Sequence, residues 1–84
     1  MNTQTTTFNQ LKPAVRIGKN GITDSTIDEI LKILKKKKTI KVKFLNSFMD
    51  GKVKKEVFEE VAKKTGSKLL QSRGFTIVLH KDVN

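Results

Sequence analysis

The segment Gly18-Lys19-Asn20-Gly21 is the first candidate for chemistry in this chain of 84 residues. Glycine adopts positive φ angles and lets a ligand approach the backbone closely. The free N–H groups at the start of a following helix attract anions. Lys19 adds a full positive charge, and Asn20 can hydrogen-bond a sugar or a base edge. GxxG loops clamp backbone nucleotides in KH domains, although two glycines at a strand–helix junction are also typical of an ordinary turn.

Several basic residues outside this loop are further candidates to contact phosphate. Lys52, Lys54 and Lys55 crowd the start of a predicted helix, where a positive charge opposes the helix dipole by about a few tenths of a kcal/mol each. Pairing of Lys55 with Glu59 is the competing explanation. The lysine run 35–38 fits a solvated helix end as well as it fits RNA contact. The candidates in predicted strands and in the last hairpin are Arg16, Lys41, Lys43 and Arg73.

Catalytic and metal-binding residue sets are missing from the sequence. The chain has no cysteine and one histidine, His80, for which the sequence indicates no acidic or nucleophilic partner. The carboxylates follow helical spacings that suit caps and surface pairs, and no nucleophile–base set is evident. No glycine-rich continuation or Gly-Lys-Ser/Thr motif follows Gly21, which argues against a dinucleotide or nucleoside triphosphate loop. We predict no catalytic residue, no metal and no cofactor.

The net charge indicates a polyanionic partner. Lys and Arg number 18 against 8 Asp and Glu, which gives a formal charge of +10. A charge this large for the chain length favours nucleic acid over a role in solubility alone. A membrane surface is the weaker alternative, because the chain lacks Trp and Tyr. No apolar stretch approaches membrane-spanning length, and residues 1–7 do not resemble a secretory signal, so we expect a cytoplasmic protein.

Two strands and a helix are predicted in the first half of the chain. Residues 14–17 are β-prone, with Pro13 just before them. Thr23 is a candidate N-cap for a helix with an apolar stripe at Ile27, Ile30, Leu31 and Leu34. The helix ends in the lysine run, whose charge complements the negative end of the dipole. Residues 39–44 alternate between apolar and polar residues and predict a second strand.

A second helix and two more strands are predicted in the other half. Residues 45–50 are expected to form a connection, with Asp50 as a candidate helix cap. The expected buried positions of the helix are Val53, Val57, Phe58 and Val61. Glu59–Lys63 and Glu60–Lys64 have the favourable order for ion pairs, and Gly66 is a natural helix stop. Strands over 68–72 and 75–80 are joined at Arg73-Gly74, which we expect to be a tight hairpin. Arg73 and Phe75 could stack on a base there, and closing the end of the core is the alternative role for Phe75.

The element order predicts an α/β fold of two layers. The order is β-α-β-α-β-β, and right-handed crossovers would place both helices on one face of a four-stranded mixed sheet. The other face would then be open, with cations suited to a phosphate backbone. We expect a flexible N-terminal tail over residues 1–10 and a single domain over 11–84. The outward residues would include Arg16, Lys41, Lys43, Lys68 and His80.

The opening segment of the domain resembles the signature of the CRM domain, the YhbY-like family. The resemblance begins in residues 11–23, which read LKPAVRIGKNGIT, and continues in order through residues 40–43, Thr65-Gly66 and residues 77–81. It departs from the family at the terminal strand, where His80-Lys81 stands in place of a common Tyr-Arg pair. A basic helix usually precedes the signature, whereas the first ten residues here are short and rich in threonine.

The resemblance implies a compact RNA-binding module with a fold similar to the C-terminal domain of translation initiation factor three. Its bacterial stand-alone members associate with precursors of the large ribosomal subunit, and its plant relatives act in group II intron splicing. The family's RNA-contacting GxxG loop falls on residues 18–21. We therefore expect a binder of ribosomal RNA that acts in ribosome assembly, with no membrane and no small-molecule substrate as partner.

Two other functions stay open at this point. A small DNA-coating chromatin protein of the Alba type would share the charge and a similar element order. A protein–protein adaptor with an acidic partner would use the open sheet face. Equal affinity for duplex DNA and RNA in an obligate dimer would indicate the first, and a partner retained after nuclease treatment would indicate the second.

Overall fold

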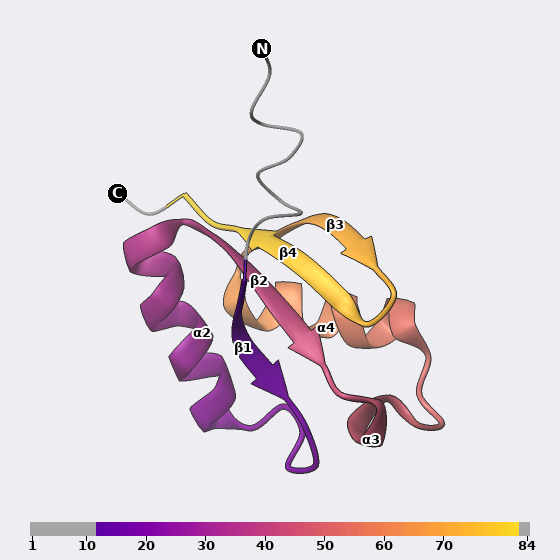
Figure 1. The fold of residues 1–84 in the computed structure, drawn as a ribbon. Coiled ribbons are helices and arrows are strands. Elements are labelled where there is room, and N and C mark those ends of the chain that lie inside the picture. The colour runs from indigo at the N-terminus through magenta and orange to yellow at the C-terminus, as the bar shows by residue number, and fades with distance from the viewer. Residues whose placement is uncertain (1–11, 83–84) are drawn as a thin grey trace.

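The computed structural model describes residues 12–82 and contains one four-stranded sheet with three helices in that range (Figure 1). The expected tail over residues 1–10 lies outside the described part. The elements, in chain order, are β1 (Pro13–Ile17), α2 (Asp24–Lys37), β2 (Thr39–Phe44), α3 (Asn46–Met49), α4 (Lys54–Thr65), β3 (Lys68–Arg73) and β4 (Thr76–His80).

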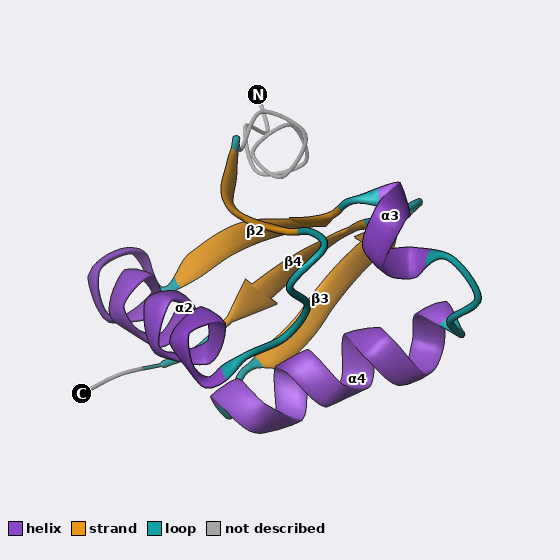
Figure 2. Cartoon of the chain, turned by 90° about the horizontal axis from the view of Figure 1, so that it is seen from below, coloured by secondary structure: helices purple, strands orange, loops and turns teal. Residues whose placement is uncertain are grey.

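The sheet is mixed, as predicted. Its strand order is β1-β2-β4-β3, with β1 parallel to β2 and β4 antiparallel to both of its neighbours. The view from below shows α2 and α4 on the same side of the sheet (Figure 2). The two-layer architecture with helices on one face is thereby confirmed, and no described helix covers the second face.

The core lies between the sheet and the two long helices. Ile40, Val42 and Phe44 of β2 alternate with lysines and are buried against the helical layer. On α2, Ile30 and Leu34 are fully buried, whereas Ile27 and Leu31 lie half-buried at the edge of the stripe. Burial of apolar side chains at this spacing is what holds a helix on a sheet, at about 1.5–3 kcal/mol for each large side chain.

Helix α2 begins and ends as its sequence predicts. The Thr23 hydroxyl accepts a hydrogen bond from the Thr26 N–H at 3.2 Å, and Asp24 occupies the first turn. Three lysines occupy the last turn. At the C-cap, Lys38 takes a φ of 62°, a conformation that L-residues other than glycine adopt at a cost. Its N–H still bonds the Leu34 carbonyl at 2.8 Å.

The connection after β2 differs from the prediction in three respects. It contains the short helix α3, which buries Met49. Asp50 does not cap the start of α4 but is the C-cap residue of α3, because the chain turns again at Gly51, with φ of 75°, and α4 begins only at Lys54. Val53 is therefore the N-cap, without a side-chain hydrogen bond, and it is 58% exposed rather than buried. The predicted stripe is correct for Val57, Phe58 and Val61.

The last hairpin turns one residue later than predicted. Its two turn residues are Gly74 and Phe75, and Arg73 belongs to β3, where it pairs with Thr76. Gly74 has a φ of 59°, as the first central position of a type II′ turn requires. Phe75 packs half-buried against the core, so it closes the end of the core as one of its two predicted roles. Residue 70 forms a bulge that shifts the alternation of β3 by one residue, so that Gln71 and Arg73 share a face with Lys68.

Candidate nucleic-acid interface

The Gly18–Gly21 loop is a tight turn with a structural reason for each glycine. The Gly21 N–H donates to the Gly18 carbonyl at 2.9 Å, and Lys19 and Asn20 between them are exposed. Gly21 has a φ of 74°. A Cβ on Gly18 would lie 2.9 Å from Leu45 Cδ1, and one on Gly21 would lie 3.2 Å from Phe48 Cε1. The turn is thus fitted against the segment that contains α3, and its two exposed side chains point away from the core.

The start of α2, which follows the loop, is a less favourable site for an anion than the sequence suggested. Thr23 already accepts the N–H of Thr26, and the Thr26 hydroxyl is 3.4 Å from the Gly21 carbonyl that it bonds. Asp24 adds a negative charge to the first turn. The loop can therefore present Lys19 and Asn20 to a ligand, but at the start of α2 the Thr26 N–H is already bonded by Thr23, and the Asp24 carboxylate opposes an anion.

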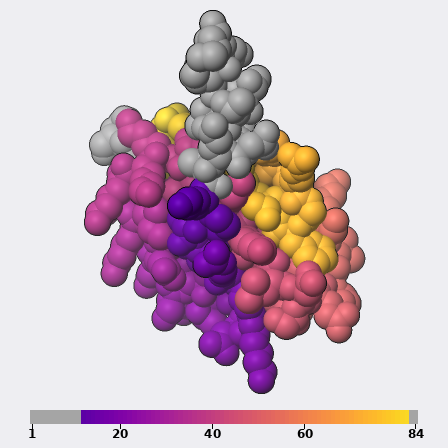
Figure 3. All heavy atoms as spheres, in the orientation of Figure 1, coloured from indigo at the N-terminus to yellow at the C-terminus, as the bar shows by residue number. Residues whose placement is uncertain are grey.

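Several segments distant in sequence meet the loop at one end of the sheet, which we call the loop end. They are the carboxyl ends of β1 and β2, α3, the start of α4 and the β3–β4 turn (Figure 1). Two backbone hydrogen bonds join them: Leu45 N–H to the Ile17 carbonyl at 2.8 Å, and Phe44 N–H to the Phe75 carbonyl at 2.7 Å. The loop protrudes at the lower edge of the molecule in the space-filling view (Figure 3).

Three predicted lysines also lie at the loop end, and two of them cover aromatic rings. Lys52 Nζ is 4.7 Å from the centre of the Phe48 ring, and Lys54 Nζ is 5.1 Å from that of Phe75. Lys55 is exposed, and within residues 12–82 it forms no ion pair with Glu59. Cation–π contacts therefore place the ammonium groups of Lys52 and Lys54 beside the loop, and the competing explanation of a Lys55–Glu59 ion pair is not supported.

On the second face of the sheet, strand register aligns three cations in one row. Arg16 of β1 pairs with Lys43 of β2, Lys43 pairs with Thr76 of β4, and Thr76 pairs with Arg73 of β3. We call these four residues the cationic row. Neighbouring strands lie about 4.8 Å apart, so Arg16 and Lys43 stand at a separation where like charges repel. All three cations are exposed.

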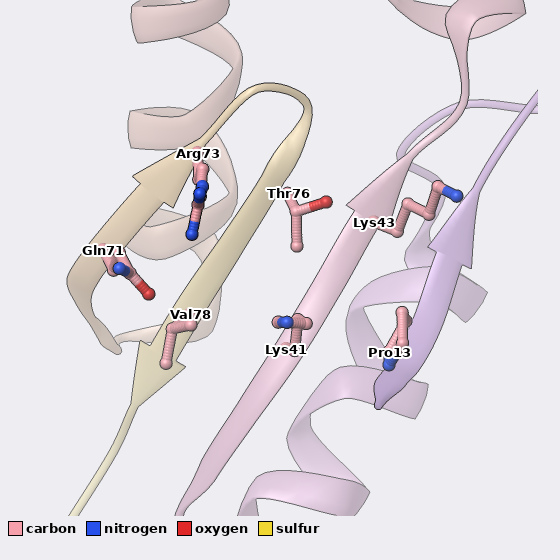
Figure 4. A pocket seen from close by; sticks show the side chains of 7 residues that line it. All are labelled: Pro13, Lys41, Lys43, Gln71, Arg73, Thr76 and Val78. Atoms are coloured by element: carbon pink, nitrogen blue, oxygen red, sulfur yellow. The ribbon is translucent and has the colours of Figure 1, made fainter. Parts of the chain in front are cut away.

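A hollow of about 330 Å³ opens beside the cationic row (Figure 4). A second register row crosses its floor, from Pro13 through Lys41 and Val78 to Gln71. Val78 is 1% exposed but lies outside the main core cluster. The residues lining the hollow are Pro13, Lys41, Lys43, Gln71, Arg73, Thr76 and Val78.

The predicted site residues thus fall into two adjoining groups. Arg16, Lys41, Lys43 and Arg73 share the second face, and the loop with the three lysines of the α4 start forms the loop end. Sequence reasoning missed Gln71 and Thr76, which add an amide and a hydroxyl to the hollow. For Gln71 the missing signal was the bulge at residue 70, which shifts the alternation of β3 and cannot be read from the residue types alone. Thr76 lies in β4 and shares the face of His80 by simple alternation.

His80 has partners that the sequence did not indicate. Its Nδ1 is 2.7 Å from Thr39 Oγ1, and its Nε2 is 2.9 Å from an oxygen of the exposed Asp82. The expectation of no acidic partner is therefore wrong, because Asp82 lies only two residues along the chain and folds back. The contact lies at the end of the sheet opposite the loop, away from the residues proposed to contact phosphate.

The described range contains neither a candidate metal site nor a candidate membrane span. Among residues 12–82, no three His, Cys, Asp or Glu side chains are grouped so that they could hold a metal ion. None of the helices in this range is long and apolar enough to cross a membrane.

Comparison with known proteins gives three concordant matches. The model of the CRS1 / YhbY (CRM) domain matches residues 3–81. "Probable RNA-binding protein YqeI" of Bacillus subtilis is 36% identical over 72 residues, which are 86% of this chain and 73% of that protein. The solution structure of the hypothetical protein SAV1595 from Staphylococcus aureus, proposed to bind RNA, superposes with a TM-score of 0.75 at 31% identity, covering 95% of this chain and 81% of that one.

Proposed function

Because the chain belongs to the CRS1 / YhbY (CRM) domain family, we propose that it is a non-catalytic RNA-binding protein that acts on ribosomal RNA during assembly of the large subunit. The names of its relatives support RNA as the ligand. The ribosomal target follows from the family resemblance of residues 11–23. A formal charge of +10 on 84 residues supports a polyanionic ligand such as RNA.

The cationic row is the observation on which this proposal rests. Arg16 and Lys43 are like charges at directly paired positions, so they repel each other, and an anion that lies across them relieves this repulsion. A phosphate backbone supplies such an anion and releases its counterions when it binds. Lys41, half-buried in the adjacent hollow, adds a further charge within the same face.

The loop supplies the second contact surface in this proposal. Lys19 and Asn20 are exposed at the tip of a turn whose shape is fixed by contacts with Leu45 and Phe48. A turn held in this way needs little backbone ordering at binding, so that the main entropic cost is the side-chain freedom of Lys19 and Asn20. Lys52, Lys54 and Lys55 extend the positive surface from the loop towards the hairpin.

The salt dependence of RNA binding tests the proposal. Affinity for a labelled fragment of large-subunit ribosomal RNA is measured across a salt series for the wild type and for Lys41→Gln with Lys43→Gln. The logarithmic slope should flatten by roughly 0.7 to 0.9 for each phosphate that the variant no longer neutralises. An unchanged slope would remove the second face from the interface, and no salt-sensitive binding by the wild type would reject RNA as the ligand.

A second variant separates the loop from the sheet. Lys19→Ala with Asn20→Ala should weaken RNA binding while the melting curve stays native, because both side chains are exposed. Duplex DNA of equal length is the competitor. Equal competition by DNA and RNA would favour the DNA-coating alternative over the proposed function.

A further inference from the structure

An unfilled groove separates the start of α4 from the edge of the sheet on the helical face. Its volume is about 440 Å³. We call it the α4–β3 groove. The residues that line it are Lys54, Lys55, Phe58, Glu59, Leu69, Ser72 and Gly74. It begins at the loop end but lies on the side of the sheet opposite the cationic row, and only its two lysines were among the residues predicted to contact RNA.

The groove exists because small residues stand where large ones could have closed it. Ser72 and Leu69 pair with the buried Ile77 and Leu79, so they belong to the helical face of the outermost strand. Ser72 is exposed, and a Cβ on Gly74 would meet no atom within 4 Å. Leu69 is left 38% exposed, although it lies beside Phe58, which is only 4% exposed. An apolar wall is therefore accessible from solvent at an otherwise basic end of the molecule.

The lining has the chemistry that one nucleotide needs. Leu69 and the edge of Phe58 offer an apolar surface to the faces of a base. Lys54 and Lys55 stand beside it for the phosphate, and the contact of Lys54 with the Phe75 ring fixes one of these charges next to the β3–β4 turn. Glu59 can accept a hydrogen bond from the exocyclic amino group of a base, and Ser72 can donate or accept one.

We propose that the α4–β3 groove takes one unstacked base of single-stranded RNA, with a preference for bases that carry an exocyclic amino group. The inference rests on the proposed function and adds to it an element of sequence preference. The backbone of the same strand continues over the lysines at the start of α4 towards the loop. Charge complementarity selects RNA, because the two lysines suit the phosphate while Glu59 suits a base amino group and would repel an acidic peptide.

The test fills the groove without changing charge. Ser72→Phe places a ring in the groove. The control Leu70→Phe adds the same ring to the bulge residue of the same strand, which does not line the groove. Affinity is measured for single-stranded RNA that carries one 2-aminopurine and for all-C and all-U oligonucleotides. Thermal melting checks that each variant is folded, and Leu69→Ala is the second variant, which removes the wall without filling the groove.

The proposal expects a decrease of about tenfold in affinity for Ser72→Phe, the size of one base-stacking interaction, with Leu70→Phe near wild type. The wild type should raise 2-aminopurine fluorescence and prefer all-C to all-U RNA, and Leu69→Ala should reduce both effects. If Ser72→Phe kept the affinity and the fluorescence of the wild type, the proposed base-binding role of the groove would be wrong, whereas the proposed function would stand. Absence of RNA binding by the wild type would overturn both. A fluorescent acidic peptide displaced only in Ser72→Phe would assign the groove to a protein partner instead.

Discussion

The two ends of the sheet are both rich in lysine, yet they place these cations in opposite electrostatic surroundings. At the end opposite the loop, Lys81 Nζ donates to the Thr65 carbonyl at 2.9 Å, and lysines fill the last turns of α2 and α4. Each of these charges meets the negative end of a helix. At the loop end, Lys54 and Lys55 stand at the positive end of α4, which has no side-chain cap.

This difference shows that charge count alone does not identify a binding surface. The lysines opposite the loop stabilise the fold, and an RNA ligand would have to compete with the helices for them. The lysines at the loop end destabilise the helix by their position, and an anion that binds there offsets this effect. Aromatic contacts with Phe48 and Phe75 hold two of them in place in the absence of that anion.

Charge reversal at each end should separate the two roles most strongly. Lys19→Glu with Lys55→Glu should lower RNA affinity by about 10- to 100-fold, because the new carboxylates repel the phosphates that the lysines attract. Lys36→Glu with Lys63→Glu changes the net charge equally but should instead lower the unfolding free energy by about 1–2 kcal/mol, because both residues lie in last turns. Fluorescence anisotropy and urea denaturation measure the two effects. Equal decreases of affinity in both pairs would mean that only the overall field matters.

Removing the Lys81 hydrogen bond at the C-terminal end of α4 tests the structural role of the end of the sheet opposite the loop. Lys81→Met keeps the apolar stem but removes the hydrogen bond to Thr65, and should lower the unfolding free energy by about 1 kcal/mol. RNA affinity of the folded protein should not change. Lys68→Met, at an exposed position of β3, is the control in urea denaturation. If Lys81→Met lowered RNA affinity under conditions in which the variant is fully folded, the end of the sheet opposite the loop would belong to the interface.

A new cap at the start of α4 should sharpen the comparison from the other side. Val53→Ser supplies the missing side-chain acceptor and should raise the unfolding free energy by about 0.5–1 kcal/mol without altering RNA affinity. Val53→Asp should stabilise the helix similarly but weaken RNA binding, since its charge opposes the phosphate. Identical affinities for the two variants would show that RNA does not approach the start of α4.

The smallest expected effect concerns the strained C-cap of α2. Lys38→Gly relieves the positive φ and should raise the melting midpoint slightly, equivalent to about 0.5 kcal/mol. Lys37→Gly, one residue earlier and inside the helix, should instead destabilise by up to about 1 kcal/mol. Neither change should move RNA affinity. Stabilisation by both would indicate that charge repulsion in the lysine run outweighs backbone conformation.

Local pattern was sufficient to predict the four strands and the two long helices, but not the short helix α3 or the exact start of α4. The alternation of residues 39–44 and the Thr23 cap predicted β2 and the start of α2 correctly, because both depend on neighbours within one turn or pleat. The start of α4 was misplaced because α3 and Gly51 intervene, and α3 is stabilised by the burial of Met49 in the tertiary core.

The candidate site was predicted residue by residue but not as an arrangement. Arg16, Lys43 and Arg73 were each expected to be candidates, yet their alignment depends on strand order and on bulges in β1 and β3. The α4–β3 groove depends likewise on which small residues face α4. Such features arise from pairing between strands far apart in the chain, which cannot be predicted from a short segment of the sequence.

The strand order also determines when the interface can first exist. The last strand of the sheet along the chain, β4, lies between β2 and β3 rather than at an edge. While the chain is being synthesised, Lys43 and Arg73 emerge before the strand that brings them into one row. A nascent chain in which β4 has not yet emerged therefore lacks the complete cationic row. The row is complete only once β4 has paired with both β2 and β3.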